Sequence, residues 1–570
     1  MIRIILFWLL QALWLAGLGR IVQQWWWKRQ RVGPAETIWL GLAVAVMFAQ
    51  LWHFVWPINA ACTSVLIVAS LPGLWLLWKE RHDMALQRKD LIFWGGLLLL
   101  IALIAASHVA VRSIIVSDTR LYHLNVVRWN NEFPVVPGLA NLHQRFGVNS
   151  TWLLYSSLLD IGWAEGRSAW LVSGLPLMLV IAQWMAVFFL RHGPEHVPAK
   201  IYCLLTLPYL LDLIEGLRPN LYYDKPPLLL LLVLGLHLLK APWLRRTSEP
   251  STDWRPSALW CLTAAALAFT FKASTATALI FVSLALIYQW WRTKGQTTDL
   301  VKIWALPTLL VLGYMLTNVV ISGWPLFPLA ILGVPVSWAQ PREDVVAFHR
   351  LIVDWAPLQS SEGMTKVREG FWVWWPLWLQ MFAKTAEHFM AVVCLIGSTC
   401  MVWAFMTKPL HRYPWQTWAV FGLSAMGAGG IAFWMITAPD LRFGDGLFYF
   451  WFGIWGTLTA PLLIRSHRLQ LMGAGVLCLI LISWVRPVLL PWLPFHTINV
   501  SRARSDEVIA KQSPGTPTIW TPLDRTLDML GDSKLPSAPT LDPRLRMRDP
   551  NDLGAGFYLA EPEPSPTQPK

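Results

Sequence analysis

Charged residues are scarce in this sequence, because Asp, Glu, Lys and Arg together make up only 14% of its 570 residues. A soluble chain of this length would carry roughly a quarter. The deficit, together with long apolar runs, excludes a soluble enzyme and an intrinsically disordered protein. Acidic residues are fewer than basic ones, with 33 Asp and Glu against 46 Lys and Arg, which gives a formal net charge of +13. In so apolar a chain we assign the excess to cytoplasmic loops of a membrane protein, and we expect no nucleic-acid partner.

Cysteine is also rare, and none of the six residues has a partner at a spacing typical of metal ligands. Each falls in or beside an apolar run, so we predict neither a disulfide framework nor a zinc site. These residues are Cys62, Cys203, Cys261, Cys394, Cys400 and Cys478. The sequence also lacks a P-loop, a dinucleotide-binding fingerprint and a zincin helix, which leaves nucleotide and zinc chemistry without support.

Apolar residues are abundant, at 55% of the chain, and they form unbroken runs such as LIFWGGLLLLIALIAA. Apolar runs of about twenty residues are typical of transmembrane helices. We therefore predict an all-α polytopic membrane protein with about 14 transmembrane helices. The predicted spans are residues 2–19, 37–57, 60–78, 91–112, 168–190, 198–215, 226–241, 257–272, 274–291, 302–322, 387–407, 415–437, 446–464 and 469–487.

Basic residues fall in alternate loops between these spans, from Arg20 and Lys28 in the first loop to Arg465 and Arg468 in the last. Basic loops lie on the cytoplasmic side of a membrane. This alternation predicts a membrane protein with both termini extracytoplasmic. The predicted divisions are a three-span segment 1–90, a seven-span module 91–322 with a long outer loop 113–167, a second outer loop 323–386, a four-span segment 387–487, and an extracytoplasmic tail 488–570.

Asp118 is the first candidate on the predicted outer face, because it comes just after the fourth span. A carboxylate there could take a proton from an acceptor hydroxyl, or hold a divalent metal ion against a phosphate. The alternative is a solvated aspartate beside the membrane. Its neighbours Arg120, Tyr122 and His123 are candidates for substrate binding. Apart from this divalent-metal alternative, the sequence indicates no cofactor.

Lys272 is the second candidate, as the only charge within more than thirty apolar residues, at the predicted turn between two spans. An ionisable residue in such a position is by default a functional-site hypothesis. A lysine facing a membrane-bound phosphate would satisfy it. The alternative is a side chain that snorkels to the membrane interface.

A third set of candidates lies in two further outer loops, with Asp224 and Lys225 in NLYYDKPP, and Asp440 and Arg442 in APDLRFGDG. A guanidinium can bind phosphate through two parallel hydrogen bonds, which a lysine cannot do. Asp440 could orient Arg442 or simply pair with it. Cations from separate loops on one face, together with a carboxylate, indicate a site for an anionic substrate.

The order of these segments resembles the GT-C superfamily of membrane glycosyltransferases, with an acidic residue at the start of a long outer loop, six further spans and a second long outer loop. The stretches DTRLYHLNVVRWNNEFPVVPGLANLHQRFGVNS, SGWPLFP and APDLRFGDG are also similar to an uncharacterised family of bacterial multi-pass proteins described as glycosyltransferase-like. The resemblance implies a GT-C-like core with amphipathic helices in the loop 113–167, and it implies that Asp118 matches the family's acidic residue. Many GT-C members carry a pair of acidic residues, and SDTR has only Asp118.

The resemblance also implies an activity, the transfer of a sugar from a polyprenyl-phosphate carrier to a glycan or lipid acceptor outside the cytoplasm, in cell-envelope glycan synthesis. Asp118 would be the catalytic residue, and Lys272 and Arg442 would hold the donor phosphate. One alternative is a polysaccharide polymerase or ligase, for which His349 and Arg350 would carry more weight. Another is a lipid or glycan transporter, a flippase, with charged residues deep in its spans.

Overall fold

The computed structural model describes residues 2–26, 33–80, 88–112, 114, 118–240, 253–407, 416–485, 508–511, 517–523 and 529–560. Its regular structure is overwhelmingly helical, as predicted. The long helices are α1 (Ile2–Trp26), α2 (Pro34–His53), α3 (Ala60–Lys79), α4 (Arg88–Val111), α9 (Gly174–Phe189), α10 (Val197–Glu215), α11 (Lys225–Lys240), α12 (Arg255–Phe271), α13 (Ala276–Thr293), α14 (Thr297–Ser322), α18 (Ala386–Thr407), α19 (Gln416–Thr437), α20 (Leu441–Leu463) and α21 (His467–Ile482).

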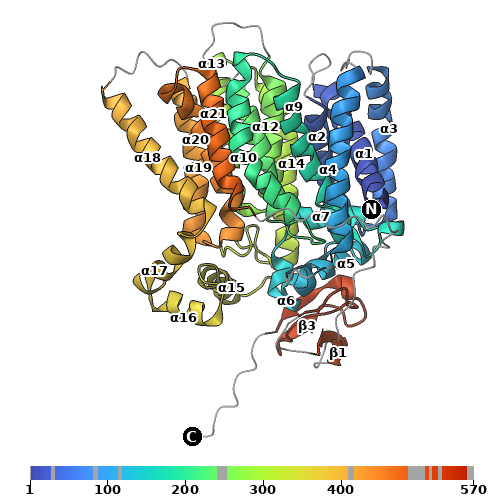
Figure 1. Cartoon of the computed structure of the whole chain (residues 1–570). Coiled ribbons are helices and arrows are strands. Elements are labelled where there is room, and N and C mark those ends of the chain that lie inside the picture. The colour runs from blue at the N-terminus through green and yellow to red at the C-terminus, as the bar shows by residue number, and fades with distance from the viewer. Residues whose placement is uncertain are drawn as a thin grey trace.

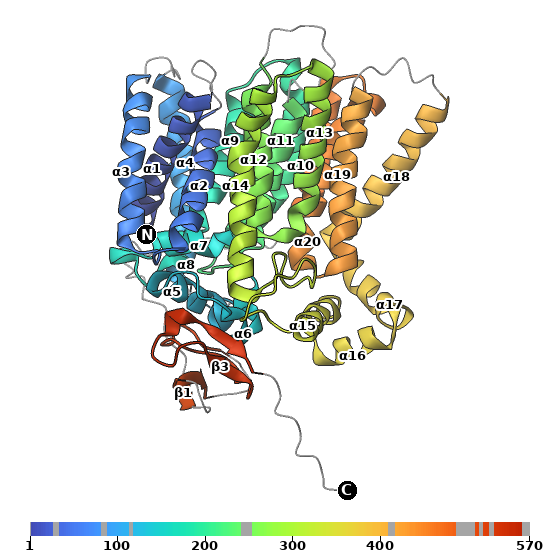
Figure 2. The same ribbon diagram turned by 180° about the vertical axis from the view of Figure 1, so that it is seen from behind.

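The long helices run side by side in one bundle, with α1–α4 at one side, α9–α14 in the middle and α18–α21 at the other side (Figures 1 and 2). Seven helical segments of the described chain are long and apolar enough to cross a membrane, or eight if a bent pair forms one span. The prediction of a multi-pass helical membrane protein is therefore confirmed. A helix lies at each predicted span, but the remaining helices do not meet this length and composition criterion.

The predicted alternation of basic loops can be followed only in part. The loops at 27–32, 81–87, 241–252 and 408–415 lie outside the described residues. The five cysteines whose side chains are described are buried free thiols. They are Cys62, Cys203, Cys261, Cys394 and Cys478.

Glycines allow α1 to pack closely against α2 and α3. A Cβ atom on Gly41 of α2 would collide with the backbone of Leu15, and one on Gly73 of α3 would collide with the backbone of Gly17. Small residues let helix backbones approach each other within a membrane, where apolar side chains gain little by leaving lipid. A larger residue at either position would push these three helices apart.

The first long segment between spans folds into short helices at one end of the bundle (Figure 1). They are η1 (Thr119–His123, a π-helical turn), α5 (Leu124–Glu132), α6 (Leu139–Leu142), η2 (Gln144–Gly147), α7 (Thr151–Leu159), η3 (Gly162–Ala164) and α8 (Ser168–Leu171). The sequence predicted amphipathic helices here, and this is wrong for α7, whose nine residues are all buried. Helices α2, α5 and α12 pack around it, and the Tyr155 hydroxyl donates to Gln11 of α1 at 3.0 Å.

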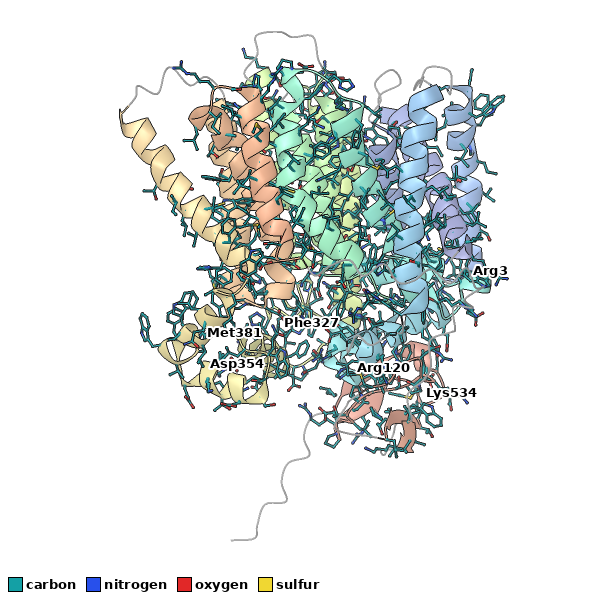
Figure 3. All side chains as sticks on the ribbon, in the orientation of Figure 1. Arg3, Arg120, Phe327, Asp354, Met381 and Lys534 are labelled. Atoms are coloured by element: carbon teal, nitrogen blue, oxygen red, sulfur yellow. The ribbon has the colours of Figure 1, made fainter. Side chains whose placement is uncertain are left out.

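The second long segment, within the predicted loop 323–386, contains α15 (Arg342–Trp355), α16 (Ser361–Glu369) and α17 (Phe371–Phe382). These helices form a lobe at the same end of the bundle, and α17 meets α18 at a bend of 97° (Figure 1). Figure 3 shows Asp354 and Met381 in this lobe, apart from Arg120 and Lys534, which lie toward the C-terminal β-structure.

The described part of the tail, residues 508–511, 517–523 and 529–560, forms a small β-structure that we call the C-terminal module. Its strands are β1 (Val508–Lys511), β2 (Ile519–Pro522), β3 (Leu545–Met547) and β4 (Phe557–Leu559), paired antiparallel as β1–β2 and β3–β4. Phe557 and Leu530 share an apolar cluster with Trp129 of α5 and Leu139 of α6. The module therefore packs on the segment that follows Asp118.

Candidate functional site

Charged side chains from separate parts of the chain meet at the end of the bundle where α12 ends and α11 and α20 begin. We call this set the charge network. Acidic and basic residues are equal in number in it, so its formal charges balance. Its members are Asp118, Arg145, Asp224, Lys225, Lys272, Asp440, Arg442 and Asp445.

Asp118 lies directly before η1 and accepts hydrogen bonds from two guanidiniums. Nη1 of Arg442 lies 3.2 Å from Oδ2, and Nη1 of Arg145 lies 3.3 Å from Oδ1. The Asp118 side chain is 16% exposed, whereas those of Arg442 and Arg145 are 38% and 41% exposed. Two accessible cations therefore flank one largely covered carboxylate.

Asp440 fixes the position of Arg442. It is the N-cap of α20, and its Oδ1 accepts from the backbone N–H of Arg442 at 3.0 Å, while its Oδ2 accepts from Nε of the same residue at 2.9 Å. Nε2 of Gln359, in the outer lobe, also donates to Oδ1 at 2.9 Å. Asp440 is 1% exposed, and burial raises its pKa above the ordinary value although Arg442 opposes this shift. Its role is to orient Arg442 rather than to meet a ligand.

The turn that carries Lys272 is formed by the end of α12. Lys272 takes an extended conformation, with φ −154° and ψ 120°, so the helix stops at Phe271 before α13 begins at Ala276. The Ser150 hydroxyl donates to the Phe271 carbonyl at 2.7 Å, and the Thr275 hydroxyl donates to the Lys272 carbonyl at 3.0 Å. These bonds satisfy carbonyls that a helix end leaves without partners and fix the position of the turn that carries the lysine at the end of the bundle.

The Lys272 ammonium pairs with Asp224 in the loop before α11. Both side chains are mostly covered, at 16% and 9% exposure. Burial alone raises the pKa of Asp224, but the charges of Lys272, Arg442 and Lys225 outweigh it and hold that pKa below the ordinary value. Asp224 therefore carries its charge at neutral pH and serves as the counter-ion of Lys272.

An ion pair between Lys225 and Asp445 connects the N-terminal ends of α11 and α20. Lys225 is the first residue of α11, and its ammonium pairs with Asp445 in the first turns of α20. The hydroxyl of Tyr209, on α10, donates to Asp445 at 3.2 Å. The pair joins α11 to α20, and the Tyr209 bond adds α10, so these contacts fix the three helices around the network.

An aromatic ring brings Lys272 and Arg442 together. Nζ of Lys272 lies 3.5 Å from the centroid of the Phe443 ring, and Cζ of Arg442 lies 4.7 Å from the same centroid. The Tyr222 ring lies 5.9 Å from Cζ of Arg442. Cations are attracted to aromatic faces by about 0.5–2 kcal/mol, so Phe443 offsets part of the repulsion between them. Asp118, Lys272 and Arg442 thus converge on one place.

Tyr122 and His123 lie in η1, close after Asp118. The hydroxyls of Tyr122 and Tyr223 are 2.8 Å apart, and the His123 ring lies 4.2 Å from that of Tyr122 and 5.2 Å from that of Tyr223. Burial lowers the pKa of His123 to about 4, so the imidazole is neutral at pH 7. Cζ of Arg145 lies 5.7 Å from the centroid of the Tyr122 ring, so these uncharged aromatic residues pack against the network.

Three other candidates have different surroundings. The Arg120 carbonyl accepts from the backbone N–H groups of Leu530 and Gly531 at 3.1 and 2.7 Å, which ties η1 to the C-terminal module. Arg350 is 72% exposed and lies 3.9 Å from Asp354 on its own helix, with His349 beside it on α15. The structure does not bring the α15 residues into the charge network.

Sequence reasoning missed three residues of the site. Asp445 had a readable signal, because a carboxylate near the start of an apolar helix needs a partner. Arg145 lies in a polar loop with nothing to distinguish it from its neighbours, and Gln359 is an isolated polar residue of the second outer segment. Only the fold shows that these two contact Asp118 and Asp440.

The residues present do not fit a divalent metal ion. Both Asp118 oxygens accept from guanidiniums, and the oxygens of Asp440 are taken by Arg442 and Gln359. Within the described chain, no group of three or more His, Cys, Asp or Glu side chains could hold a metal. The chemistry of this site therefore rests on protonated cations and carboxylates.

Comparison with known proteins gives a family without an assigned activity. No curated protein and no solved structure matches this chain. One family model, described as a domain of unknown function (DUF8201), matches residues 1–449, a range that contains the whole charge network. Because the match covers most of the sequence, the chain belongs to this family.

Proposed function

We propose that this protein is an integral membrane glycosyltransferase of the GT-C type. It transfers a sugar from a polyprenyl-phosphate-linked donor to a glycan or lipid acceptor outside the cytoplasm, in cell-envelope glycan synthesis. The observation that carries the proposal is the convergence of Asp118, Arg442 and Lys272 at one end of the bundle.

The cations suit the phosphate of a lipid-linked donor. Arg442 and Arg145 both bond to Asp118 and are both partly exposed, so a donor phosphate can take over these guanidinium contacts and release a carboxylate oxygen. Arginine binds phosphate through parallel charge-assisted hydrogen bonds. Lys272 lies against the same Phe443 ring as Arg442 and adds a third cation. The phosphate lies close to the membrane because these residues lie at the ends of apolar helices.

The reaction is a displacement at the anomeric carbon. An acceptor hydroxyl oxygen forms the new bond to that carbon, and its proton passes to the Asp118 carboxylate. The bond from the anomeric carbon to the phosphate oxygen breaks, and the phosphate leaves with the electron pair. Arg442 and Lys272 stabilise the charge that develops on this oxygen, as fixed cations do in a site with little water.

The placement of charge favours an enzyme over a transporter. A transporter needs polar groups along a path through the bundle. Here the charge network gathers at one end, and the buried pair Arg20–Glu80 and the pair His237–Glu36 lie near the ends of their helices. We propose that the network end faces outward, with 14 spans, both termini extracytoplasmic and the bacterial inner membrane as the location.

The proposal is tested by reconstituting the full chain in lipid nanodiscs with a panel of radiolabelled polyprenyl-phosphate sugars and an envelope glycan and lipid extract. We expect label to move from donor to acceptor with wild type and to stay in the donor with Asp118→Asn. Asp354→Asn is the matched control, because Asp354 is also buried and bonds to an arginine, Arg368, at 2.7 Å. Equal transfer by wild type and Asp118→Asn, or no transfer from any donor, would refute the proposal.

A further inference from the structure

Helix α17, in the outer lobe, has an exposed side that is apolar. Its 12 residues, FWVWWPLWLQMF, include no charged side chain. Trp372, Pro376 and Leu379 share one side of the helix, because residues three and four positions apart are neighbours on a helix surface. All three are exposed, Trp372 at 81% and Leu379 at 38%. An exposed apolar face of this kind marks a contact with another protein or with a membrane.

The other side of α17 packs against the ends of two long helices. The rings of Trp375, Trp378 and Phe382 stack in a row, with successive centroids 5.1 and 4.8 Å apart. Trp378 lies 6.0 Å from Trp434 in the last turn of α19, and Phe382 lies 5.7 Å from Phe448 in the first turns of α20. Because α17 packs on the ends of apolar helices, it lies at the level where the bundle leaves the membrane.

The connection to α18 favours lipid over a protein partner. Helix α17 turns by 97° into α18, and the two together have the apolar composition of a membrane span, so α17 runs across the direction of a helix of the bundle (Figure 1). Lys384, at the bend, is exposed, and lysine side chains beside a membrane extend toward the headgroups. Tryptophan is enriched at the same level. We infer that α17 lies in the headgroup region of the bilayer at the network end, with the Trp372 and Leu379 side inserted among the lipids.

Contacts of the packed side connect α17 to the charge network. Nε1 of Trp378 donates to the Pro439 carbonyl at 2.9 Å, and the next residue, Asp440, orients Arg442. Gln359, in the same lobe, donates to Asp440. A lipid contact on the exposed side of α17 therefore holds the lobe beside the loop that positions Arg442. The inference concerns the contact with lipid alone and does not depend on the transfer reaction.

The test measures how deep α17 lies in a bilayer. Leu379→Cys is introduced in the full chain, labelled with bimane and reconstituted in nanodiscs of phosphatidylcholine brominated either near the headgroup end or near the methyl end of its acyl chains. Wild type labelled in parallel gives the background, because its described cysteines are buried. We expect quenching of the label at 379 by both lipids, with a ratio of shallow to deep quenching above one, since an interfacial helix inserts only its apolar face at the boundary of the acyl chains.

Two matched labels calibrate the depth. Leu284→Cys, 62% exposed in the middle of α13, should give the opposite ratio, and Glu362→Cys, on α16 with a side chain 79% exposed, should be quenched by iodide in water and not by lipid. A label at 379 that behaves like the one at 362 would overturn the inference, because α17 would then lie in water. So would the ratio found at 284, which would place α17 in the membrane core, and so would protection from both lipid and iodide, which would mean that protein covers the face. Trp372→Cys decides the test if Leu379→Cys does not fold.

Discussion

Removing Lys272 alone should lower both the stability of the fold and the affinity for the donor. The two effects can be separated by also removing the charge of its partner, Asp224. Lys272→Met leaves Asp224 buried at 9% exposure without its direct counter-ion. Breaking a buried pair from one side costs about 3–5 kcal/mol. Arg442 and Lys225 still act on Asp224, so we expect the low end, about 3 kcal/mol.

The double variant Lys272→Met with Asp224→Asn removes both charges and leaves two uncharged side chains of similar size. Replacing a whole buried pair is often close to neutral, so its stability should return to within about 1 kcal/mol of wild type. Unfolding is followed by intrinsic fluorescence in one detergent, for wild type, both single variants and the double variant. The double-mutant cycle isolates the coupling between the two residues.

The same four proteins are then assayed for binding of the lipid-linked donor. The double variant should be as stable as wild type but should bind the donor more weakly than wild type does, because it lacks one phosphate contact. Loss of stability in the double variant equal to the sum of the two single losses would refute the pairing. Wild-type donor affinity in a stable double variant would refute the phosphate role of Lys272.

Three further predictions concern pH, the C-terminal module and topology. Burial lowers the pKa of His123 to about 4, so the unfolded chain takes up a proton first as pH falls from 6.5, and His123 should contribute a stability loss of up to roughly 3 kcal/mol between pH 6.5 and 4. His143, whose pKa burial also lowers, and the buried His53 contribute over the same range, so His123→Leu should make this part of the profile less steep without removing its slope, and an unchanged profile would contradict the reasoning. Asn125 is fully buried and donates to the Gly531 carbonyl at 2.7 Å, so Asn125→Ala should make residues 508–560 more sensitive to limited proteolysis, and equal cleavage would show that this bond does not hold the module. Reporter fusions at residues 85 and 510 should lie on opposite sides of the membrane, and the same side for both would refute the proposed topology.

The positions of the long helices could be predicted from hydropathy alone, because each predicted span coincides with a helix, although only seven or eight segments are long and apolar enough to cross a membrane. The turn at Lys272 was also readable, since one charge interrupts more than thirty apolar residues. The position of α7 was not, because a stretch such as TWLLYSSLL fits a membrane-surface helix and a buried one equally well. What decided it was the packing of α2, α5 and α12 around it, which depends on contacts far apart in the sequence.

Most residues of the candidate site were predictable from the sequence, and so was the pair of Asp440 with Arg442, but the other ion pairs were not. Asp118, Lys272 and Arg442 stood out because charges are rare beside apolar spans. Arg145, which bonds to Asp118, and Gln359, which bonds to Asp440, did not stand out, because a polar residue in a polar loop carries no signal of its own. The packing of the C-terminal module on η1 could not be predicted from the sequence either, because it involves backbone hydrogen bonds to the Arg120 carbonyl, which any residue could make.

The most direct test of the proposed function separates donor binding from transfer in Asp118→Asn. This change keeps the shape of the side chain and removes the negative charge between Arg145 and Arg442. Donor affinity, measured by equilibrium binding of a radiolabelled polyprenyl-phosphate sugar, should be retained or increased because both guanidiniums lose a competing anion. Single-turnover transfer should fall by about 10²–10⁴-fold, the usual contribution of a positioned base. Transfer at the wild-type rate by this variant would contradict the account.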